Sequence, residues 1–254
     1  MNIAIITGAS SGLGVEFFKE IQKEKNLDEV WVIARRKEKL ESICQEYGQI
    51  KSRVVPMDIT LEENIAALKE LFENENVDIR FLINNAGFGT IGYLAESDYK
   101  SQGAMIDLNV KALTEITAIA LNHMSDGACI INTCSIASFV PNARMTVYSS
   151  TKAFVLSFSK ALRYELKMCK RKINVTAICP GPMDTEFLAV AGIEKGTSKT
   201  FDTLPRCNVE KTARNGIKAA KRGKGIYTPH PFFKFYRFLS KILPHSWLMG
   251  AAKT

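Results

Sequence analysis

Ile3-Ala4-Ile5-Ile6 runs directly into Thr7-Gly8-Ala9-Ser10-Ser11-Gly12-Leu13-Gly14 near the start of the chain. The apolar run predicts a buried strand, and the glycine-rich octapeptide predicts a tight turn followed by the start of a helix. Glycines let a backbone approach a pyrophosphate closely, and the free N–H groups at a helix amino terminus attract anions. The spacing is GxxxGxG, not the common GxGxxG, so the nucleotide site is predicted mainly from the strand, turn and helix context.

The remainder of the chain repeats this order of apolar run and amphipathic stretch. Strands are expected at 30–34, 54–55, 79–83, 128–133 and 173–178, and helices at 12–26, 36–47, 61–74, 98–124 and 146–169. Strands that are apolar on both faces and alternate with helices predict a parallel sheet covered on both sides, which is a doubly wound α/β fold. We expect one domain over residues 1–254. Such folds bind ligands beyond the carboxyl ends of the strands, so the residues after each strand are the candidates for a site.

The composition predicts one sizeable core. The chain has 254 residues, of which 46% are hydrophobic. Its first residues are interpreted as a strand and not as a secretory signal, and no stretch has the roughly 20 uninterrupted apolar residues of a membrane-spanning helix. Six scattered cysteines form no CxxC pair, and the three histidines lie near no cysteine pair. We therefore expect reduced thiols, no bound metal and a cytoplasmic protein.

Basic residues stand where an acid is usual after the second predicted strand. Dinucleotide-binding folds that prefer NAD place an acidic residue there for the ribose hydroxyl, but this chain has Arg35-Arg36-Lys37. Three cations at the start of a helix oppose its dipole, so a nearby anion would explain them. The 2′-phosphate of NADP is such an anion, and an arginine fork suits it. A solvated basic turn is the alternative.

Two polar turns follow the third and fourth predicted strands. Asp58-Ile59 and Asn84-Asn85-Ala86-Gly87 are expected at the same edge of the sheet as the glycine motif. We expect Asp58 to accept a hydrogen bond from an adenine amino group, and Asn84 to bond to the backbone and hold this edge together. Gly87 would let the nucleotide sit close. Taken singly, each is also compatible with ordinary turn chemistry.

Tyr148 and Lys152 lie four residues apart at the start of a predicted helix, which places them one turn apart on the same face. The spacing alone is not distinctive, because a second Tyr-Lys pair, at 47 and 51, shares it. Tyr148 differs in having Ser135 thirteen residues upstream, just after a predicted strand, and Asn109 within the preceding predicted helix. Because Ser135 and Asn109 accompany it in this order, Tyr148 is the candidate acid/base.

The ordered set of these motifs resembles the short-chain dehydrogenase/reductase family. The set is TGASSGLG (7–14), Asp58, NNAG (84–87), Asn109, Ser135, YSSTK (148–152) and PGPMDT (180–185), and it covers about residues 1 to 185. Two departures are mild: Cys134 and Ser138 stand where relatives often have serine and glycine.

The resemblance implies a Rossmann-type sheet of about seven strands and an NADP(H)-dependent oxidoreductase that acts on carbonyl or secondary-alcohol groups. It implies a catalytic tetrad of Asn109, Ser135, Tyr148 and Lys152. The residues that it assigns to the cofactor are Gly8, Ser10, Ser11, Gly12, Leu13, Gly14, Arg35, Arg36, Asp58, Ile59, Asn85, Ala86, Gly87, Tyr148, Lys152, Pro180, Gly181 and Thr185. Within this set, Thr185 and the Pro180-Gly181 turn would hold the nicotinamide, and Arg35 would mark a preference for NADP.

The chemistry expected of Tyr148 depends on the charge around its phenol. A free tyrosine has a pKa of about 10 and is a poor base near neutral pH. We expect the Lys152 ammonium and the positive nicotinamide ring to stabilise its anion, and the Ser135 hydroxyl to stabilise the oxyanion of a reacting carbonyl. Lys152 would also hold the nicotinamide ribose, and the family pattern implies that Asn109 anchors a water that relays protons to Lys152.

The carboxyl-terminal part carries the excess positive charge. Residues 195–254 contain 13 Lys and Arg but only 2 acids, and 229–254 is rich in aromatic residues. Three interpretations of this basic aromatic extension stay open: a lid or packing helix on the enzyme, a membrane-surface helix, and a site for an acidic partner. Nucleic acid is disfavoured, because the chain contains no recognised reading module.

The substrate is expected to be set by the 183–205 loop and by the extension. The 189–208 stretch is poorly patterned and predicts a mobile loop that could fold over a substrate. The apolar residues expected to flank the pocket are Phe139, Val140, Phe187, Leu188 and Ile193. They favour a small hydrophobic substrate, first a hydroxysteroid or its ketone and second a 3-ketoacyl group on a carrier. A non-catalytic NADP-sensing protein is the alternative of another class.

Two predicted helical stretches are apolar around more than one face. They are 104–121 and 153–166. A helix of this kind must bury its second face too, which predicts a homodimer or homotetramer. A thicker core within one chain is the alternative.

Overall fold

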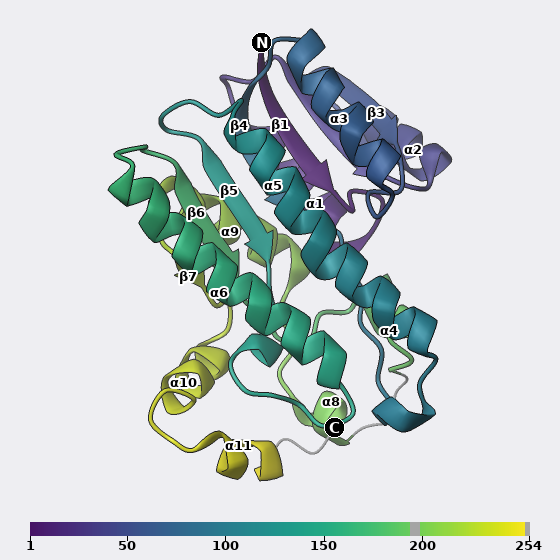
Figure 1. The fold of residues 1–254 in the computed structure, drawn as a ribbon, viewed down its shortest axis with the longest axis vertical. Helices are drawn as coiled ribbons and strands as arrows, with labels where there is room; N and C mark the ends of the chain where they lie inside the picture. The colour runs from purple at the N-terminus through teal and green to yellow at the C-terminus, as the bar shows by residue number, and fades with distance from the viewer. Residues whose placement is uncertain (194–198, 252–254) are drawn as a thin grey trace.

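Seven parallel strands form one sheet in the order β3-β2-β1-β4-β5-β6-β7. They are β1 (Asn2–Thr7), β2 (Glu29–Ala34), β3 (Ser52–Pro56), β4 (Asp78–Asn84), β5 (Cys129–Thr133), β6 (Asn174–Ile178) and β7 (Ile226–Tyr227). The computed structural model describes residues 1–193 and 199–251 (Figure 1). The strand order reverses between β1 and β4, because the chain runs outward to β3 and then returns to the other side of β1. The predicted doubly wound Rossmann-type sheet is confirmed, and this reversal is where such folds bind ligands.

Helices cover both faces of the sheet (Figure 1). They are α1 (Gly12–Ile21), α2 (Lys37–Tyr47), α3 (Glu62–Asn74), α4 (Tyr99–Ile106), α5 (Leu113–Leu121), α6 (Thr146–Met168), α7 (Glu186–Val190), α8 (Lys199–Thr203), α9 (Val209–Lys221), α10 (Pro231–Leu239) and α11 (His245–Ala251). Side chains of α3, α5 and α6 fill the core on one face, and those of α1, α2 and α9 fill the core on the other. A π-helical segment, Asp107–Ala112, joins α4 to α5, so the helix expected at 98–124 is one helical stretch with a local irregularity.

Alternate side chains of β1 enter the two cores. Ile3 and Ile5 belong to the core under α3 and α5, whereas Ala4 and Ile6 belong to the core under α1 and α9. All four are fully buried, because a strand covered on both sides has no solvent face. Burial of each isoleucine contributes about 1.5–3 kcal/mol. The central strand is therefore a rigid support for the glycine-rich turn at its carboxyl end.

The described parts of the expected substrate loop contain two short helices, α7 and α8. The mobile-loop prediction for 189–208 is therefore wrong where α7 ends and where α8 lies, and residues 194–198 lie outside the described residues. Each helix has five residues, which is too short for a periodic pattern to be recognised in the sequence.

The chain continues after β7 into α10 and α11, which lie beyond the carboxyl ends of the strands (yellow, bottom of Figure 1). Met1 begins at the opposite end of the sheet. Over the part of the chain that the structure describes, no helix combines the length and the apolarity needed to cross a bilayer.

Candidate functional site

A cavity of about 970 Å³ lies beyond the carboxyl ends of the strands. The residues predicted for cofactor binding or catalysis that line it are Gly8, Ser10, Ser11, Gly12, Leu13, Arg35, Arg36, Asp58, Ile59, Asn85, Ala86, Gly87, Ser135, Tyr148, Lys152, Pro180, Gly181 and Thr185. Gly14 and Asn109 are buried and do not line it. The volume lies in the range of small-molecule and cofactor sites.

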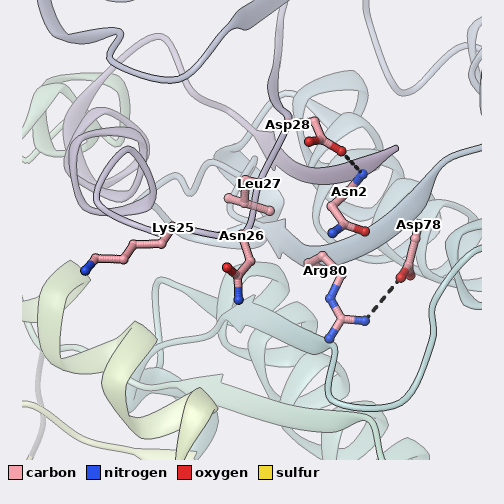
Figure 2. Close-up of a pocket in the computed structure, with 7 residues that line it drawn as sticks. All are labelled: Asn2, Lys25, Asn26, Leu27, Asp28, Asp78 and Arg80. Atoms are coloured by element: carbon pink, nitrogen blue, oxygen red, sulfur yellow. Dashed lines mark hydrogen bonds and ion pairs between the residues drawn. The ribbon is translucent and has the colours of Figure 1, made fainter.

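A smaller hollow of about 360 Å³ lies at the opposite edge of the sheet, where β1 and β4 begin (Figure 2). Apart from Lys25, its charged groups already have partners: Arg80 contacts Asp78 at 3.2 Å, and Asp28 accepts a hydrogen bond from the Asn2 backbone at 2.7 Å. None of the described residues that line it is a serine, cysteine, tyrosine or histidine. The larger cavity is therefore the candidate site.

The glycine-rich turn after β1 is fastened to the turn after β4. Thr7 Oγ1 accepts hydrogen bonds from the backbone N–H groups of Asn85 at 3.0 Å and Ala86 at 3.1 Å. Gly8 has a φ of +66°, and a Cβ at this position would lie 2.7 Å from the Ala86 Cα. A side chain would strain the backbone and push the two turns apart. The two turns form a backbone cradle beside the amino terminus of α1, which suits a pyrophosphate.

Asn84 is buried in the core and does not hold the edge of the sheet. The prediction that it bonds to the backbone is wrong, because its Nδ2 donates to Thr117 Oγ1 and Asn132 Oδ1, both at 2.9 Å. Asn85 makes the backbone contact instead, from its Nδ2 to the Gly8 carbonyl at 3.2 Å. Neighbouring side chains at a strand end point to opposite sides, so a shift of one residue exchanges the two roles.

Arg36 and Lys39, at the start of α2, share a carboxylate from the start of α7. Glu186 accepts hydrogen bonds from Arg36 at 3.1 Å and from Lys39 at 2.9 Å. Arg36 also donates to Ser10 Oγ at 3.1 Å. The hydrogen bond from Lys39, together with that from Arg36, outweighs desolvation and lowers the pKa of Glu186. The protein thus supplies an anion for Arg36, one of the three cations singled out in the sequence, and for Lys39. No local sequence pattern predicts this contact.

Arg35 is the more open of the two arginines. Its side chain is 79% exposed, with Nη1 3.9 Å from Asp58 Oδ2. The other carboxylate oxygen of Asp58 accepts hydrogen bonds from the Thr60 backbone N–H at 3.0 Å and the Thr60 hydroxyl at 2.7 Å. Asp58 is therefore fixed in the wall of the cavity, and the Arg35 guanidinium is accessible beside it. The adenine contact of Asp58 and the 2′-phosphate contact of Arg35 stay predictions.

Tyr148, Ser135 and Lys152 meet in the wall of the cavity, and all three side chains are buried. Tyr148 and Lys152 lie on one face of α6, with Lys152 Nζ 5.8 Å from the centre of the Tyr148 ring. Ser135 follows β5, and its hydroxyl lies near enough to the Tyr148 phenol to act on the pKa of that phenol. Lys152 Nζ donates to the Thr133 carbonyl at 2.9 Å. The fold thus brings Ser135, from the end of β5, to the Tyr148 and Lys152 pair of α6.

Burial governs the acidity of Tyr148 and Lys152. It raises the pKa of Tyr148, and the nearby Ser135 hydroxyl offsets only part of that rise. It lowers the pKa of Lys152. The chain's own groups therefore do not give the lowered phenol pKa expected from the sequence, because desolvation disfavours the phenolate more than its neighbours stabilise it. Additional positive charge beside the phenol would be needed to lower this pKa.

Asn109 lies behind the cavity in the π-helical segment, where it is 1% exposed. Its Oδ1 accepts a hydrogen bond from the Phe88 N–H at 3.0 Å, and its Nδ2 donates to the Phe88 carbonyl at 2.8 Å and to Thr151 Oγ1 at 3.1 Å. These bonds fasten the segment after β4 to α6. π-helical turns are frequent at functional sites. The proton relay expected of Asn109 stays a prediction.

Two buried cysteines beneath the site received no role from the sequence. Cys134 and Cys179 follow β5 and β6, and their thiols are hydrogen-bonded to one another. Cys134 Sγ also lies 3.1 Å from the Lys152 carbonyl. Burial raises the pKa of Cys179; in Cys134 the same effect is outweighed by hydrogen bonds from Cys179 and Ser138 and by the Lys152 charge, which lower its pKa. Their pairing depends on strands that are neighbours only in the sheet.

The carboxyl-terminal extension forms one wall of the cavity. Phe233 of α10 is fully buried, and a Cβ on Gly181 would lie 2.0 Å from its ring. Glycine therefore lets the Pro180-Gly181 turn pack directly on α10. Tyr236 of α10 and Leu248 of α11 line the cavity. The inward face of the extension packs on the rest of the chain, as expected from one of its three interpretations.

Only part of the expected apolar lining faces the cavity. Phe187 and Leu188 line it, and the Phe187 ring centre lies 5.7 Å from that of Tyr148. The expectation is wrong for the other residues, which do not line the cavity: Phe139, Val140 and Ile193. The Phe139 ring packs 6.5 Å from that of Tyr236 and so supports α10 from within the core.

The residues present fit a nicotinamide dinucleotide. The cavity joins the backbone cradle and the arginines after β2 to Tyr148 and Lys152, which suits a ligand with an anionic middle and a reactive end. Within residues 1–193 and 199–251, no three His, Cys, Asp or Glu side chains are grouped so that they could hold a metal ion.

Known proteins are similar to this chain in sequence and in fold. The family model described as short chain dehydrogenase matches residues 2–195. An uncharacterised oxidoreductase of Staphylococcus aureus strain MW2 is 31% identical over 189 residues, which are 74% of this chain and 80% of that protein. A short-chain dehydrogenase from Sphingobium yanoikuyae, solved in complex with NADPH, has a TM-score of 0.77 at 26% identity and covers 98% of this chain and 96% of its own. A short chain dehydrogenase/reductase from Burkholderia phymatum, solved with NAD, has a TM-score of 0.81 at 19% identity, with 94% and 92% covered.

Proposed function

Because the chain belongs to the short-chain dehydrogenase family, we propose that it is an NADP(H)-dependent oxidoreductase that moves a hydride between nicotinamide and a ketone or secondary alcohol. One observation carries the proposal: Ser135, Tyr148 and Lys152 meet in the wall of the same cavity that the glycine-rich turn lines. This arrangement supports the proposal because it would offer an acid and a hydrogen-bond donor to one substrate oxygen, with a cation beside them.

The bound dinucleotide would supply or accept the hydride, and the chain would handle the proton. In reduction, Tyr148 donates its proton to the carbonyl oxygen; its raised pKa keeps it protonated before the reaction. Ser135 donates a hydrogen bond to the same oxygen as negative charge develops there. The Lys152 ammonium holds the nicotinamide ribose and stabilises the phenolate that remains. In oxidation each proton moves in the opposite direction.

Arg35 and Arg36 support NADP as the preferred cofactor. They stand after β2, where folds that prefer NAD have an acid. Arg35 is largely exposed in the cavity wall, and Arg36 is held by Glu186, another anion. The similar Sphingobium protein was solved with NADPH and the Burkholderia protein with NAD. The proposed preference for NADP therefore rests on the two arginines and not on the fold.

The proposed substrate is a hydrophobic ketone or alcohol of hydroxysteroid type. Support comes from the apolar and aromatic side chains that line the cavity from the substrate loop and the extension: Phe187, Leu188, Val190, Phe201, Phe232, Tyr236 and Leu248. A 3-ketoacyl group on an acidic carrier is the second candidate, favoured by the 13 basic residues in 195–254.

The proposed assembly is a single-domain chain in a homodimer or homotetramer. In the α4–α5 stretch, Ile106 is 47% exposed and Val110 is only partly buried. On α6, Phe154 stacks on Phe158 with ring centres 5.9 Å apart and is 41% exposed. A second copy that covered these side chains would remove apolar surface from water.

NADPH oxidation by the full chain tests the proposed function. The panel contains steroid ketones, 3-ketoacyl thioesters and small carbonyl compounds. Turnover of a steroid ketone is the expected result, and turnover confined to thioesters would select the second substrate. Tight NADPH binding without oxidation by any member would overturn the oxidoreductase proposal in favour of a non-catalytic NADP-sensing protein.

A further inference from the structure

The last part of the chain has no negative side chain. No Asp or Glu follows Glu210, whereas ten Lys and Arg do. Some of these cations are paired, because Lys221 contacts Glu24 at 2.7 Å and Arg214 contacts Glu210 at 3.3 Å. Lys234 and Lys241 are exposed and form no ion pair with any described residue. The extension therefore presents uncompensated positive charge.

Large apolar side chains gather on the outward side of the same segment. Phe232, Phe235 and Phe238 recur every three residues along α10, which places them on one side of the helix. We name the α10–α11 face by its exposed residues: Lys234, Phe235, Phe238, Lys241, Ile242 and Trp247. Its apolar members are 57–69% exposed: Phe238 57%, Phe235 60%, Ile242 62% and Trp247 69%. Clustered apolar exposure of this kind marks an interaction surface.

The other side of the same two helices lines the cavity. Phe233 packs on Gly181, and Tyr236 and Leu248 face the interior. Phe232 joins the two sides, because it lines the cavity and is 49% exposed. Figure 1 shows both helices at the outer end of the molecule, beyond the carboxyl ends of the strands. Whatever covers the α10–α11 face is thus separated from the cavity by these two helices alone.

We propose that the α10–α11 face docks on an anionic lipid bilayer. Aromatic side chains, tryptophan above all, settle at the boundary between headgroups and acyl chains, and lysines beside them meet anionic headgroups. A second copy of the chain is a poorer occupant, because a symmetric pair would bring the same lysines together with no acid on either copy. An acidic protein would match the lysines but leave the exposed aromatic and aliphatic side chains to be covered by a complementary apolar surface.

Docking in this way would hold the wall formed by α10 and α11 at the membrane surface. A lipophilic ketone or alcohol could then enter from the bilayer past Phe232, without crossing water. This part of the inference rests on the proposed function and narrows it to substrates that partition into lipid.

Vesicle sedimentation of the full chain, without cofactor or substrate, tests the docking. We expect binding to vesicles of phosphatidylcholine with phosphatidylglycerol, little binding to phosphatidylcholine alone, and weakening as salt rises. Phe235→Ser with Phe238→Ser should lower the partition coefficient about ten-fold or more, because apolar burial is lost. Lys234→Gln with Lys241→Gln should lower it about five-fold per lysine.

Matched variants elsewhere on the surface are the controls. Leu61→Ser with Tyr99→Ser removes exposed apolar side chains, and Lys160→Gln with Lys167→Gln removes two charges from α6; both should bind as the unaltered chain does. NADPH binding should persist in every variant, which shows that each one folds. Three results would overturn the docking. The first is no binding of the unaltered chain to anionic vesicles, and the second is an equal loss of vesicle binding in the control variants. The third is that the unaltered chain self-associates in lipid-free solution and only the variants of the α10–α11 face do not.

Activity measurements with vesicles test whether docking helps a lipid-dissolved substrate to reach the cavity, separately from whether docking occurs. Anionic vesicles should raise the turnover of a lipid-dissolved ketone several-fold in the unaltered chain but not in the Phe235→Ser, Phe238→Ser variant, and should leave a water-soluble ketone unaffected. Binding without this stimulation would keep the docking and overturn its link to the substrate. Absence of all turnover would overturn the proposed function, and the vesicle result would stand apart from it.

Discussion

Arg36 and Glu186 lie 150 residues apart in the chain and form a hydrogen-bonded ion pair of 3.1 Å at the cavity. The pair joins the helix that follows β2 to the short helix of the substrate loop. A 2′-phosphate bound by Arg36 would meet the Glu186 carboxylate as a competitor of the same charge. The segment that we propose to contact the substrate is thus connected to the part of the site where we expect the cofactor to be selected.

Glu186→Gln should tighten NADPH binding by about two- to five-fold, because both partners are roughly half exposed and the pair is screened by water. NADH, which has no 2′-phosphate, should bind as before. Fluorescence titration of both cofactors at low and high salt measures this, with Glu210→Gln as a control for an exposed acid elsewhere. Weaker NADPH binding would mean that Glu186 helps to position Arg36 and does not compete with the phosphate.

Arg35→Ala should raise the KM for NADPH about ten-fold or more and leave that for NADH nearly unchanged, since a charged hydrogen bond to the 2′-phosphate is lost. Steady-state kinetics with each cofactor measures the effect. Arg222→Ala, at an exposed arginine outside the cavity, is the control. Equal effects on the two cofactors would contradict the assignment.

Tyr148→Phe should reduce kcat by about 10²–10⁴-fold, because the proton donor is removed. The Kd for NADPH should stay within about two-fold, since the ring and its packing on Phe187 remain. Tyr164→Phe alters a tyrosine of the same helix that is 66% exposed and should change neither quantity. Retained turnover in the Tyr148 variant would reject its role as the acid.

The phenol of Tyr148 should titrate differently with and without oxidised cofactor. Burial raises its pKa in the chain alone, so its phenolate should form only above the ordinary tyrosine value of about 10. The positive ring of NADP⁺ favours the phenolate and should lower that pKa, whereas the neutral ring of NADPH should lower it less. The difference in ultraviolet absorbance between the unaltered chain and Tyr148→Phe isolates this one tyrosine. Identical curves with and without NADP⁺ would show that the ring lies too far from the phenol.

Gly181→Ala should destabilise the fold by about 1–3 kcal/mol, because the added methyl group meets the Phe233 ring. In a Phe233→Leu background the same change should cost less, since the smaller side chain leaves room. Urea unfolding of the two single variants and the double variant measures this coupling. Strictly additive losses would mean that the turn and α10 do not contact each other in solution.

The sheet and most of the site could be predicted because their signals are local. Four successive residues of β1, from Ile3 to Ile6, are apolar, so both faces of the strand are apolar. This pattern is required of a strand that is covered on both sides. Tyr148 was identified by Lys152, one helical turn away, and by Ser135, which follows a strand. Because parallel strands end at one edge of the sheet, residues that follow them are expected near the same site. These patterns lie within single elements or follow from the direction of the strands.

The features that escaped prediction are contacts between elements that meet only in the folded sheet. Glu186 reaches Arg36 from the substrate loop, and Cys134 finds Cys179 at the end of the next strand. Asn84 was given the role that Asn85 plays, because the sequence does not show which of two neighbouring residues at a strand end points into the core. The spacing of apolar residues along the sequence does not predict such contacts, since each contact depends on the order of the strands in the sheet.

The match to the family model ends at residue 195, yet α10 and α11 beyond it provide a wall of the cavity. The residues that we propose for hydride transfer therefore all lie inside the matched part, whereas the lining that we propose to select the substrate is shared between that part and the extension. Substitutions confined to α10 and α11 should thus be able to change which compounds are accepted without altering the proposed proton donor or cofactor cradle.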